Sequence, residues 1–185
     1  MLNLQNIDSS WTLFLDRDGV INHEKEADYI YHYGEFEFYE GVRQALQYLS
    51  TRFGKIIIIT NQRGVGRQLM TEDDLLSIHD QMLADIEAAG GRVHKIYYCT
   101  ANDDKHSHRK PNAGMARDAL RDFPEIELTK SIMIGNKISD MQFGRNAGMH
   151  TIFVQTTDPD QSLPHPLVDM AFTDLAAFAK ALQET

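Results

Sequence analysis

The sequence predicts an α/β fold with a doubly wound parallel sheet. Five short apolar runs rich in β-branched residues alternate with helical patterns, as in parallel sheets with right-handed crossovers. The runs lack polar alternation, which indicates strands buried on both faces. Polar and acidic residues follow the runs directly, as at the carboxyl edge of an open sheet. The predicted strands cover residues 11–16, 55–60, 93–99, 131–135 and 151–155.

Apolar residues at helical spacing predict helices between these strands. Thr71 is a typical N-cap, with acidic residues in the turn that follows it, and Pro111 suits the first turn of a third helix. A fourth helix is expected over residues 139–147. The expected buried faces consist of Val42, Ala45, Leu46 and Leu49, then Leu75, Ile78, Met82 and Ile86, then Met115, Ala119 and Leu120, and in the last helix Leu175, Phe178 and Leu182.

Length, charge and cysteine content narrow the class of protein. We expect a single domain over residues 1–185. We also expect that loops, rather than a large cap domain, cover the carboxyl edge of its sheet, where ligands bind in open α/β folds. Lys plus Arg number 18 and Asp plus Glu number 27, giving a formal net charge of −9, which argues against sequence-independent binding of nucleic acid. No signal-peptide pattern and no membrane-length apolar run is found. The single cysteine, Cys99, fits a reducing compartment. We therefore expect a cytoplasmic monomer without a membrane partner.

The first predicted strand ends in two acids, Asp16 and Asp18, followed by Gly19. Two carboxylates at this position can divide the work of phosphoryl transfer. One attacks phosphorus, the other handles the proton of the leaving group, and a divalent cation offsets the negative charge. The alternative is an ordinary acidic turn, since Asp-Gly pairs are common in turns.

Polar clusters also follow the next three predicted strands. Thr60 offers a hydroxyl beside backbone N–H groups that can hold phosphate oxygens. Arg109 and Lys110 precede a helix and can neutralise carboxylates and phosphates. The fourth cluster, from Asn136 to Asp140, offers oxygen ligands for Mg²⁺. Each cluster alone has a structural explanation in a turn or a helix start, but four clusters at four successive strand ends favour a phosphoryl-transfer site.

The order of these clusters resembles the four motifs of the haloacid dehalogenase-like (HAD) phosphatases. The matching segments read DRDGV, ITNQ, RKP and GNKISD. Longer segments resemble the heptose bisphosphate phosphatases and their histidinol-phosphatase relatives. They read FLDRDGVIN, ITNQRGVGRQLMTE, IYYCT followed by RKPNAGM, and MIGNKISDMQFGRNAGM. The resemblance spans residues 12–154 and implies a HAD-like Rossmannoid fold.

The resemblance also implies a role for each motif. Asp16 is expected to attack phosphorus and form an aspartyl-phosphate, and Asp18 to protonate the leaving sugar oxygen and then activate water. Mg²⁺ is expected between Asp16, the backbone carbonyl of Asp18, the fourth motif and the substrate. The catalytic set is then Asp16, Asp18, Thr60 and Lys110, the substrate-binding set is Asn61, Gln62 and Arg109, and the metal set is Asp16, Asp18, Asn136 and Asp140. Arg109 is expected to reach the second phosphate of the substrate.

Asn136 departs from the family pattern, which has an Asp ligand for Mg²⁺ at this position. An amide oxygen can coordinate Mg²⁺, but the site loses one formal charge. Three interpretations remain open: Asn136 is the ligand, Asp140 takes over direct coordination, or the protein binds sugar phosphates without catalysis. Because every other motif is intact, we favour an active enzyme.

A second departure lies in the loop before Arg109. The heptose phosphatases carry a zinc site there, on Cys-x-His followed by Cys-x-Cys. Here the loop keeps Cys99 and replaces the later cysteines by His106 and His108. Three ligands remain, with Asp103 or Asp104 as a fourth. A lone cysteine at a strand end is usually a small buried residue, so we favour loss of zinc over a reworked site.

These observations predict a Mg²⁺-dependent phosphatase of a small sugar phosphate, with heptose 1,7-bisphosphate as the preferred substrate. The alternatives are a phosphatase of histidinol phosphate or another small phosphomonoester, and a non-catalytic sugar-phosphate-binding member of the family. The phosphatase half of a nucleic-acid end-repair enzyme also uses an acidic strand end, but the acidic net charge and the absence of a basic stripe disfavour it.

Overall fold

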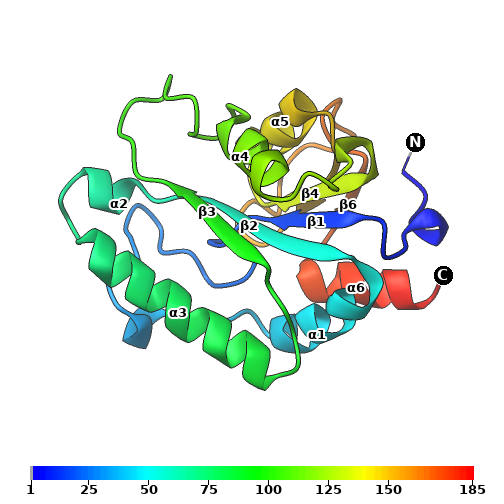
Figure 1. Cartoon of the computed structure of the whole chain (residues 1–185), viewed down its shortest axis with the longest axis horizontal. Helices are drawn as coiled ribbons and strands as arrows, with labels where there is room; N and C mark the ends of the chain where they lie inside the picture. Colours follow the sequence, from blue (N-terminus) through cyan, green and yellow to red (C-terminus); the bar gives the residue numbers. More distant parts are fainter. Residues whose placement is uncertain (1) are drawn as a thin grey trace.

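Residues 2–185, which the computed structural model describes, contain a six-stranded sheet in which every strand pairing is parallel. The strand order is β3-β2-β1-β4-β5-β6 (Figure 1). The strands are β1 (Thr12–Leu15), β2 (Lys55–Asn61), β3 (Lys95–Cys99), β4 (Ser131–Gly135), β5 (His150–Val154) and β6 (Met170–Phe172). The predicted doubly wound parallel sheet is confirmed, and β6 is a strand that the sequence patterns did not predict.

Helices cover both faces of the sheet, as Figure 1 shows. On one face lie α1 (Val42–Arg52), α3 (Glu72–Ala88) and α6 (Leu175–Gln183). On the other lie α4 (Gly114–Asp122) and α5 (Ile138–Ala147). A single helical turn, α2 (Arg63–Gly66), follows β2, and three 3₁₀ turns occupy Leu4–Asn6, Tyr33–Glu35 and Leu128–Lys130. None of the helices within residues 2–185 is long and apolar enough to cross a membrane.

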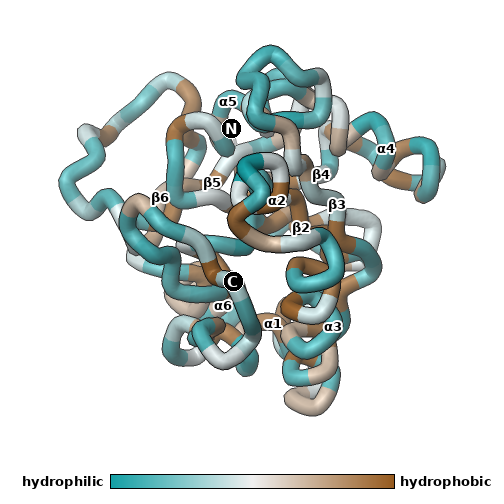
Figure 2. Tube along the Cα trace, turned by 90° about the vertical axis from the view of Figure 1, so that its left-hand side faces the viewer, coloured by the Kyte–Doolittle hydropathy of each residue, from teal (hydrophilic) through white to brown (hydrophobic). Residues whose placement is uncertain are grey.

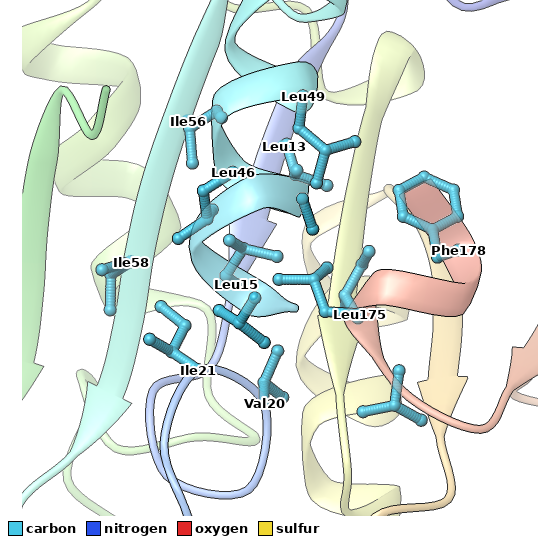
Figure 3. Packing of buried hydrophobic residues seen from close by; sticks show 14 of the residues in the cluster. Leu13, Leu15, Val20, Ile21, Leu46, Leu49, Ile56, Ile58, Leu175 and Phe178 are labelled. Carbon is cyan, nitrogen blue, oxygen red and sulfur yellow. The ribbon is translucent and has the colours of Figure 1, made fainter. Parts of the chain in front are cut away.

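Strand β1 sits between the two helical layers. Leu13 and Leu15 pack toward α1 and α6 (Figure 3), while Phe14 belongs to the cluster on the opposite face. All three side chains are fully buried, and each burial stabilises the fold by about 1.5–3 kcal/mol. Figure 2 shows apolar segments along the central strands and polar segments around them. The end of β1 is therefore held in place by a core on each side.

The helix starts test two further predictions. Thr71 caps α3 as predicted, because its hydroxyl accepts from the N–H of Asp74 and the Asp74 carboxylate accepts from the N–H of Thr71. The placement of Pro111 in a first helical turn is wrong, since α4 begins at Gly114. Asn112 follows the proline, and its amide donates to the carbonyl of His106 (3.0 Å). Asn112 therefore extends the loop instead of starting a helix.

The segment between β1 and α1 forms one wall of the site. Within residues 2–185 it carries only one 3₁₀ turn, Tyr33–Glu35, and two isolated bridges, which join Asn22 to Asp18 and to Phe38. The hydroxyl of Tyr33 donates to Asp85 of α3 (2.6 Å) and ties the segment to the helical layer. Loops rather than a second folded layer thus cover the carboxyl edge of the sheet.

Candidate active site

A tight turn follows β1 and presents the first two acids. The N–H of Asp16 still donates to Ile134 of β4 (3.0 Å), which continues the sheet pairing by one residue. Gly19 then adopts a φ of 86°. A Cβ atom at Gly19 would lie 2.0 Å from the amide nitrogen of Asn136. Glycine is therefore required here both by the backbone conformation and by the close approach of Asn136.

Asp16 is buried and has two different partners. One carboxylate oxygen accepts from the N–H of Arg17 (2.7 Å), and the other lies 2.9 Å from Nζ of Lys110. Burial raises the pKa of Asp16 to about 7, against the opposing effect of Lys110, and the nearby Asp140 adds to the rise. A buried carboxylate beside a lysine can act as a nucleophile, because the lysine balances its negative charge.

Lys110 bridges Asp16 and Asp140. Its Nζ lies 2.7 Å from Oδ1 of Asp140, and both side chains are almost completely buried. Burial acts to lower the pKa of Lys110, but Asp140 and Asp16 outweigh it, so the pKa is raised and the lysine is charged. The second oxygen of Asp140 accepts from the N–H of Lys137 (3.0 Å) at the start of α5. Both oxygens of Asp140 thus have protein donors, and one of these donors is the lysine that also pairs with Asp16.

Asp18 is held by four N–H donors. Its Oδ1 accepts from Nε and Nη2 of Arg17 (3.2 and 2.8 Å) and from Asn22 (3.0 Å). Its Oδ2 accepts from the amide of Gln62 (2.8 Å). Burial acts to raise the pKa of Asp18, but Arg17 and the other donors outweigh it, so the pKa lies below its usual value. These donors therefore favour the carboxylate form, which a general base needs.

The polar residues after β2 connect the motifs. The Gln62 amide that binds Asp18 also donates to the hydroxyl of Thr60 (2.9 Å). The side chain of Asn61 makes two hydrogen bonds to the backbone of Lys110, accepting from its N–H (3.1 Å) and donating to its carbonyl (3.2 Å). The structure thus brings Thr60, Asn61 and Gln62 together with both acids and the lysine.

Asn136 lies fully buried beside the turn of Gly19. Its amide nitrogen donates to Glu24 (3.1 Å) and to Thr157 (2.7 Å), whereas its Oδ1 is buried with no hydrogen-bond partner. Because the NH₂ group has two acceptors, the amide orientation is fixed and the oxygen remains available as a ligand. An unpartnered amide oxygen suits a hard cation such as Mg²⁺.

A pocket of about 460 Å³ lies at the carboxyl edge of the sheet. It is lined by residues that follow β1 and β2, by the loop before α4 and by the start of α5. Arg63 and Arg109 lie at its rim, and both guanidinium groups pair with the exposed carboxylate of Asp104, which is 3.1 Å from Nε of Arg109. In Figure 1, α2 and the loop before α4 lie at the same end of the sheet. Two cations at the rim of a pocket can bind a second anionic group of a ligand.

The possible zinc ligands do not form one ligand set. Sγ of Cys99 lies 3.6 Å from Nδ1 of His106, but Nε2 of His108 is directed to Asp118 (2.9 Å). The carboxylate of Asp104 is engaged by arginines, and that of Asp103 accepts from the N–H of Lys105 (2.9 Å). Across residues 2–185, no three His, Cys, Asp or Glu side chains are clustered as a ready metal site. Mg²⁺ binding here would therefore also need amide or backbone oxygens.

Several residues of the site were missed by the sequence patterns. Glu24 and Lys137 form an ion pair (2.9 Å) that also contacts Asn136, and Arg63 joins Arg109 at the rim. The Glu24–Lys137 contact joins residues far apart in the chain, so no local motif predicts that pairing, although Lys137 lies in the quoted segment GNKISD. Arg63 sits inside a quoted motif, and its charge beside a predicted phosphate-binding strand end was the available signal.

Comparison with known proteins identifies the family. A family model described as polynucleotide kinase 3 phosphatase matches residues 5–174. A D-glycero-alpha-D-manno-heptose-1,7-bisphosphate 7-phosphatase of Campylobacter jejuni is 38% identical over 142 residues, covering 77% of this chain and 80% of that protein. The chain belongs to the HAD phosphatases. It is thus a phosphoric monoester hydrolase, as the sequence predicted.

Two more relatives of this HAD phosphatase extend the match. A D-glycero-beta-D-manno-heptose-1,7-bisphosphate 7-phosphatase of Photorhabdus laumondii is 31% identical over 180 residues, covering 92% of this chain and 94% of that protein. A crystal structure of the D,D-heptose 1,7-bisphosphate phosphatase of B. bronchiseptica, complexed with magnesium and phosphate, superposes with a TM-score of 0.84 and 31% identity. The match covers 95% of this chain and 99% of that one. The HAD-like fold expected from the sequence is confirmed.

The Asn136→Asp variant tests the amide as a metal ligand. We expect the added charge to lower the Kd for Mg²⁺ about tenfold. The same change places a carboxylate against Glu24 without a donor between them, so the metal-free variant should unfold at a lower temperature. Isothermal titration with Mg²⁺ and thermal unfolding in EDTA measure the two effects.

Asn3→Asp is the matched control, because it adds the same charge to an exposed 3₁₀ N-cap. It should change neither quantity. An unchanged Kd for Mg²⁺ in Asn136→Asp would mean that Asn136 does not coordinate the cation.

Proposed function

We propose that this HAD phosphatase hydrolyses heptose 1,7-bisphosphate in a Mg²⁺-dependent reaction. The observation that carries the proposal is the buried Asp16–Lys110–Asp140 ion-pair chain, set beside Asp18 in a pocket with two arginines at its rim. These ion pairs supply a nucleophile, Asp16, with one cationic partner, Lys110. The two arginines at the rim supply positive charge for a second phosphate. The similarity to heptose bisphosphate phosphatases supports the same substrate class.

In this proposal the reaction runs in two displacements. A carboxylate oxygen of Asp16 forms a bond to phosphorus while the bond from phosphorus to the sugar oxygen breaks. Asp18, which takes up a proton when the anionic substrate beside it raises its pKa, gives that proton to the sugar oxygen. Asp18 then takes a proton from water as the water oxygen attacks the aspartyl-phosphate, which releases phosphate and restores Asp16. Lys110 and Thr60 hold the transferring phosphoryl oxygens throughout.

The residues present fit a bound Mg²⁺ ion. Asp16, the backbone carbonyl of Asp18 and Oδ1 of Asn136 would hold it, and the orphaned Asn136 oxygen supports this assignment. When bound, Mg²⁺ supplies positive charge that offsets the phosphoryl group and the carboxylates. Asp140 holds Lys110 in place, because one of its oxygens pairs with the lysine and the other accepts from the N–H of Lys137.

The second phosphate is proposed to bind between Arg63 and Arg109. The Asp104 carboxylate pairs with both guanidinium groups. Asp104 lies on an exposed loop, so a bisphosphate can displace it without disturbing the core. A monophosphate of the same sugar, lacking the second anionic group, would leave this pairing intact.

The Asp104→Asn variant tests this arrangement. Asparagine keeps the shape but frees both arginines, so we expect KM for the bisphosphate to fall about threefold. KM for a sugar monophosphate should stay unchanged.

Arg63→Ser should raise KM for the bisphosphate about tenfold. Steady-state kinetics with both substrates measure the effects, and Asp103→Asn on the same loop is the control. Equal changes for both substrates would contradict a second-phosphate site.

The direct test of the function is phosphate release from a panel of substrates. The panel holds both anomers of heptose 1,7-bisphosphate, histidinol phosphate and a 3′-phosphorylated oligonucleotide, each with Mg²⁺ and with EDTA. We expect Mg²⁺-dependent turnover of a heptose bisphosphate and little of the others. Preferred hydrolysis of the oligonucleotide would overturn the proposal, and ligand binding without phosphate release would identify a non-catalytic member.

The remaining expectations are part of the same proposal. We propose a cytoplasmic monomer in which residues 1–185 form one phosphatase domain that acts on a small metabolite, without nucleic acid or membrane as a partner. The acidic net charge of −9 supports this choice of partner. Sedimentation equilibrium tests the monomer, with a mass near 21.1 kDa as the expected result.

A further inference from the structure

A buried arginine lies between the two acids of the first motif. Arg17 is only 1% exposed, although a guanidinium group is costly to bury without partners. Its Nε and Nη2 both donate to Oδ1 of Asp18, and its Nη1 lies 3.1 Å from Nε2 of His79. The reaction proposed above uses Asp18 but assigns no part to Arg17 or His79.

His79 lies on α3, 62 positions from Arg17 in the chain, and is itself buried. Arginine Nη1 can only donate, so Nε2 of His79 must accept, and the imidazole is neutral. Burial, and then the neighbouring Arg17, lower the pKa of His79 to about 3, which agrees with this state. The ring of Tyr98 stands 5.7 Å from the imidazole and helps to fill the space around it.

The hydrogen bonds give Arg17 a fixed position. Two of its N–H groups donate to one oxygen of Asp18. A rotation of the guanidinium would therefore displace that oxygen if both hydrogen bonds were kept. The His79 bond on Nη1 opposes this rotation. Asn22 is the only other donor to that oxygen among the described residues, and it is held in the turn by the carbonyl of His23 (2.9 Å).

We propose that His79 is a positioning residue for Asp18 and acts through Arg17. The inference rests on the proposed function, in which Asp18 gives a proton to the leaving oxygen of the substrate and then takes one from water. Without an acceptor at position 79, the buried Nη1 group of Arg17 is left unpaired. The guanidinium then shifts toward another acceptor, and the Asp18 carboxylate leaves the orientation that proton transfer requires.

His79→Leu removes the acceptor at similar volume, and His79→Gln restores one near the same place. The probe is a series of phosphate monoesters, from alkyl phosphates to p-nitrophenyl phosphate. Poor leaving groups need the proton from Asp18, whereas p-nitrophenolate does not. For His79→Leu we expect kcat/KM to fall about tenfold for alkyl phosphates and by less than twofold for p-nitrophenyl phosphate. His79→Gln should recover most of the loss.

An equal loss along the whole series, or no loss, would overturn the inference, since general damage to the fold does not depend on the leaving group. His32→Leu, an exposed histidine, is the control. Crystal structures of wild type and His79→Leu give a second readout, and an unmoved Asp18 carboxylate would also refute the proposal. A wild-type enzyme that cleaves other monoesters but no heptose bisphosphate would refute the substrate proposal alone.

Discussion

Replacing Asp16 by Asn is expected to lower kcat at least about 10⁴-fold, because the variant has no carboxylate to attack phosphorus. The fold should survive and even gain stability in EDTA. Burial raises the pKa of Asp16 to about 7, so its ionised form is costly in the metal-free protein. A neutral amide avoids this cost, and Lys110 keeps its ion pair with Asp140. Phosphate release and thermal unfolding measure the two effects.

Asp80→Asn serves as the control, since Asp80 is exposed on α3. The mechanism would be wrong if Asp16→Asn retained near-normal turnover. A variant that was inactive and also unfolded would leave turnover uninterpretable. In that case mass spectrometry of the wild-type protein, quenched during turnover, should detect an added phosphoryl group on the peptide that contains Asp16.

Lys110→Met is expected to lower the free energy of unfolding by about 3–5 kcal/mol at pH 8, because two buried carboxylates lose their shared cation. The loss should shrink as the pH falls. Lys110 acts to lower the pKa of Asp16, so without it that pKa rises further, and a protonated carboxyl group needs no cation. Urea denaturation in EDTA at pH 8 and pH 5.5 measures the difference, and turnover should also fail.

Two comparisons make this prediction specific. Lys105→Met changes an exposed lysine in the same loop and should alter stability by less than about 0.5 kcal/mol. Adding Asp140→Asn to Lys110→Met should restore part of the lost stability, since it removes one unpaired charge. Equal stability of wild type and Lys110→Met at pH 8 would show that the buried ion pairs do not stabilise the fold.

The sheet could be predicted from local patterns because its central strands are apolar on both faces. The run from Lys55 to Asn61 places four isoleucines in succession, and all four are fully buried. Strand β6 gave no such signal. It has three residues, all only partly buried, because it pairs with a single neighbour at the edge of the sheet. An edge strand needs no apolar run, so only its pairing with β5 defines it.

The site was predictable to the extent that the topology determines it. Parallel strands bring their carboxyl ends to one edge, which is why Asp16, Thr60 and Asn136 could be expected together. The partners of these residues could not be predicted in the same way. Arg17 contacts His79, which lies 62 positions away in the chain. Glu24 contacts Asn136, which lies 112 positions away. Neither carries a spacing that a sequence pattern can detect.

The pairing of Asn61 with the backbone of Lys110 has a consequence for variation in this family. The Asn61 amide engages both the N–H and the carbonyl of one residue, much as a neighbouring strand would. Lys110 is therefore anchored to the sheet and not to the preceding loop. That loop can change in length and sequence while the ammonium group keeps the position in which we propose that it holds the phosphoryl group.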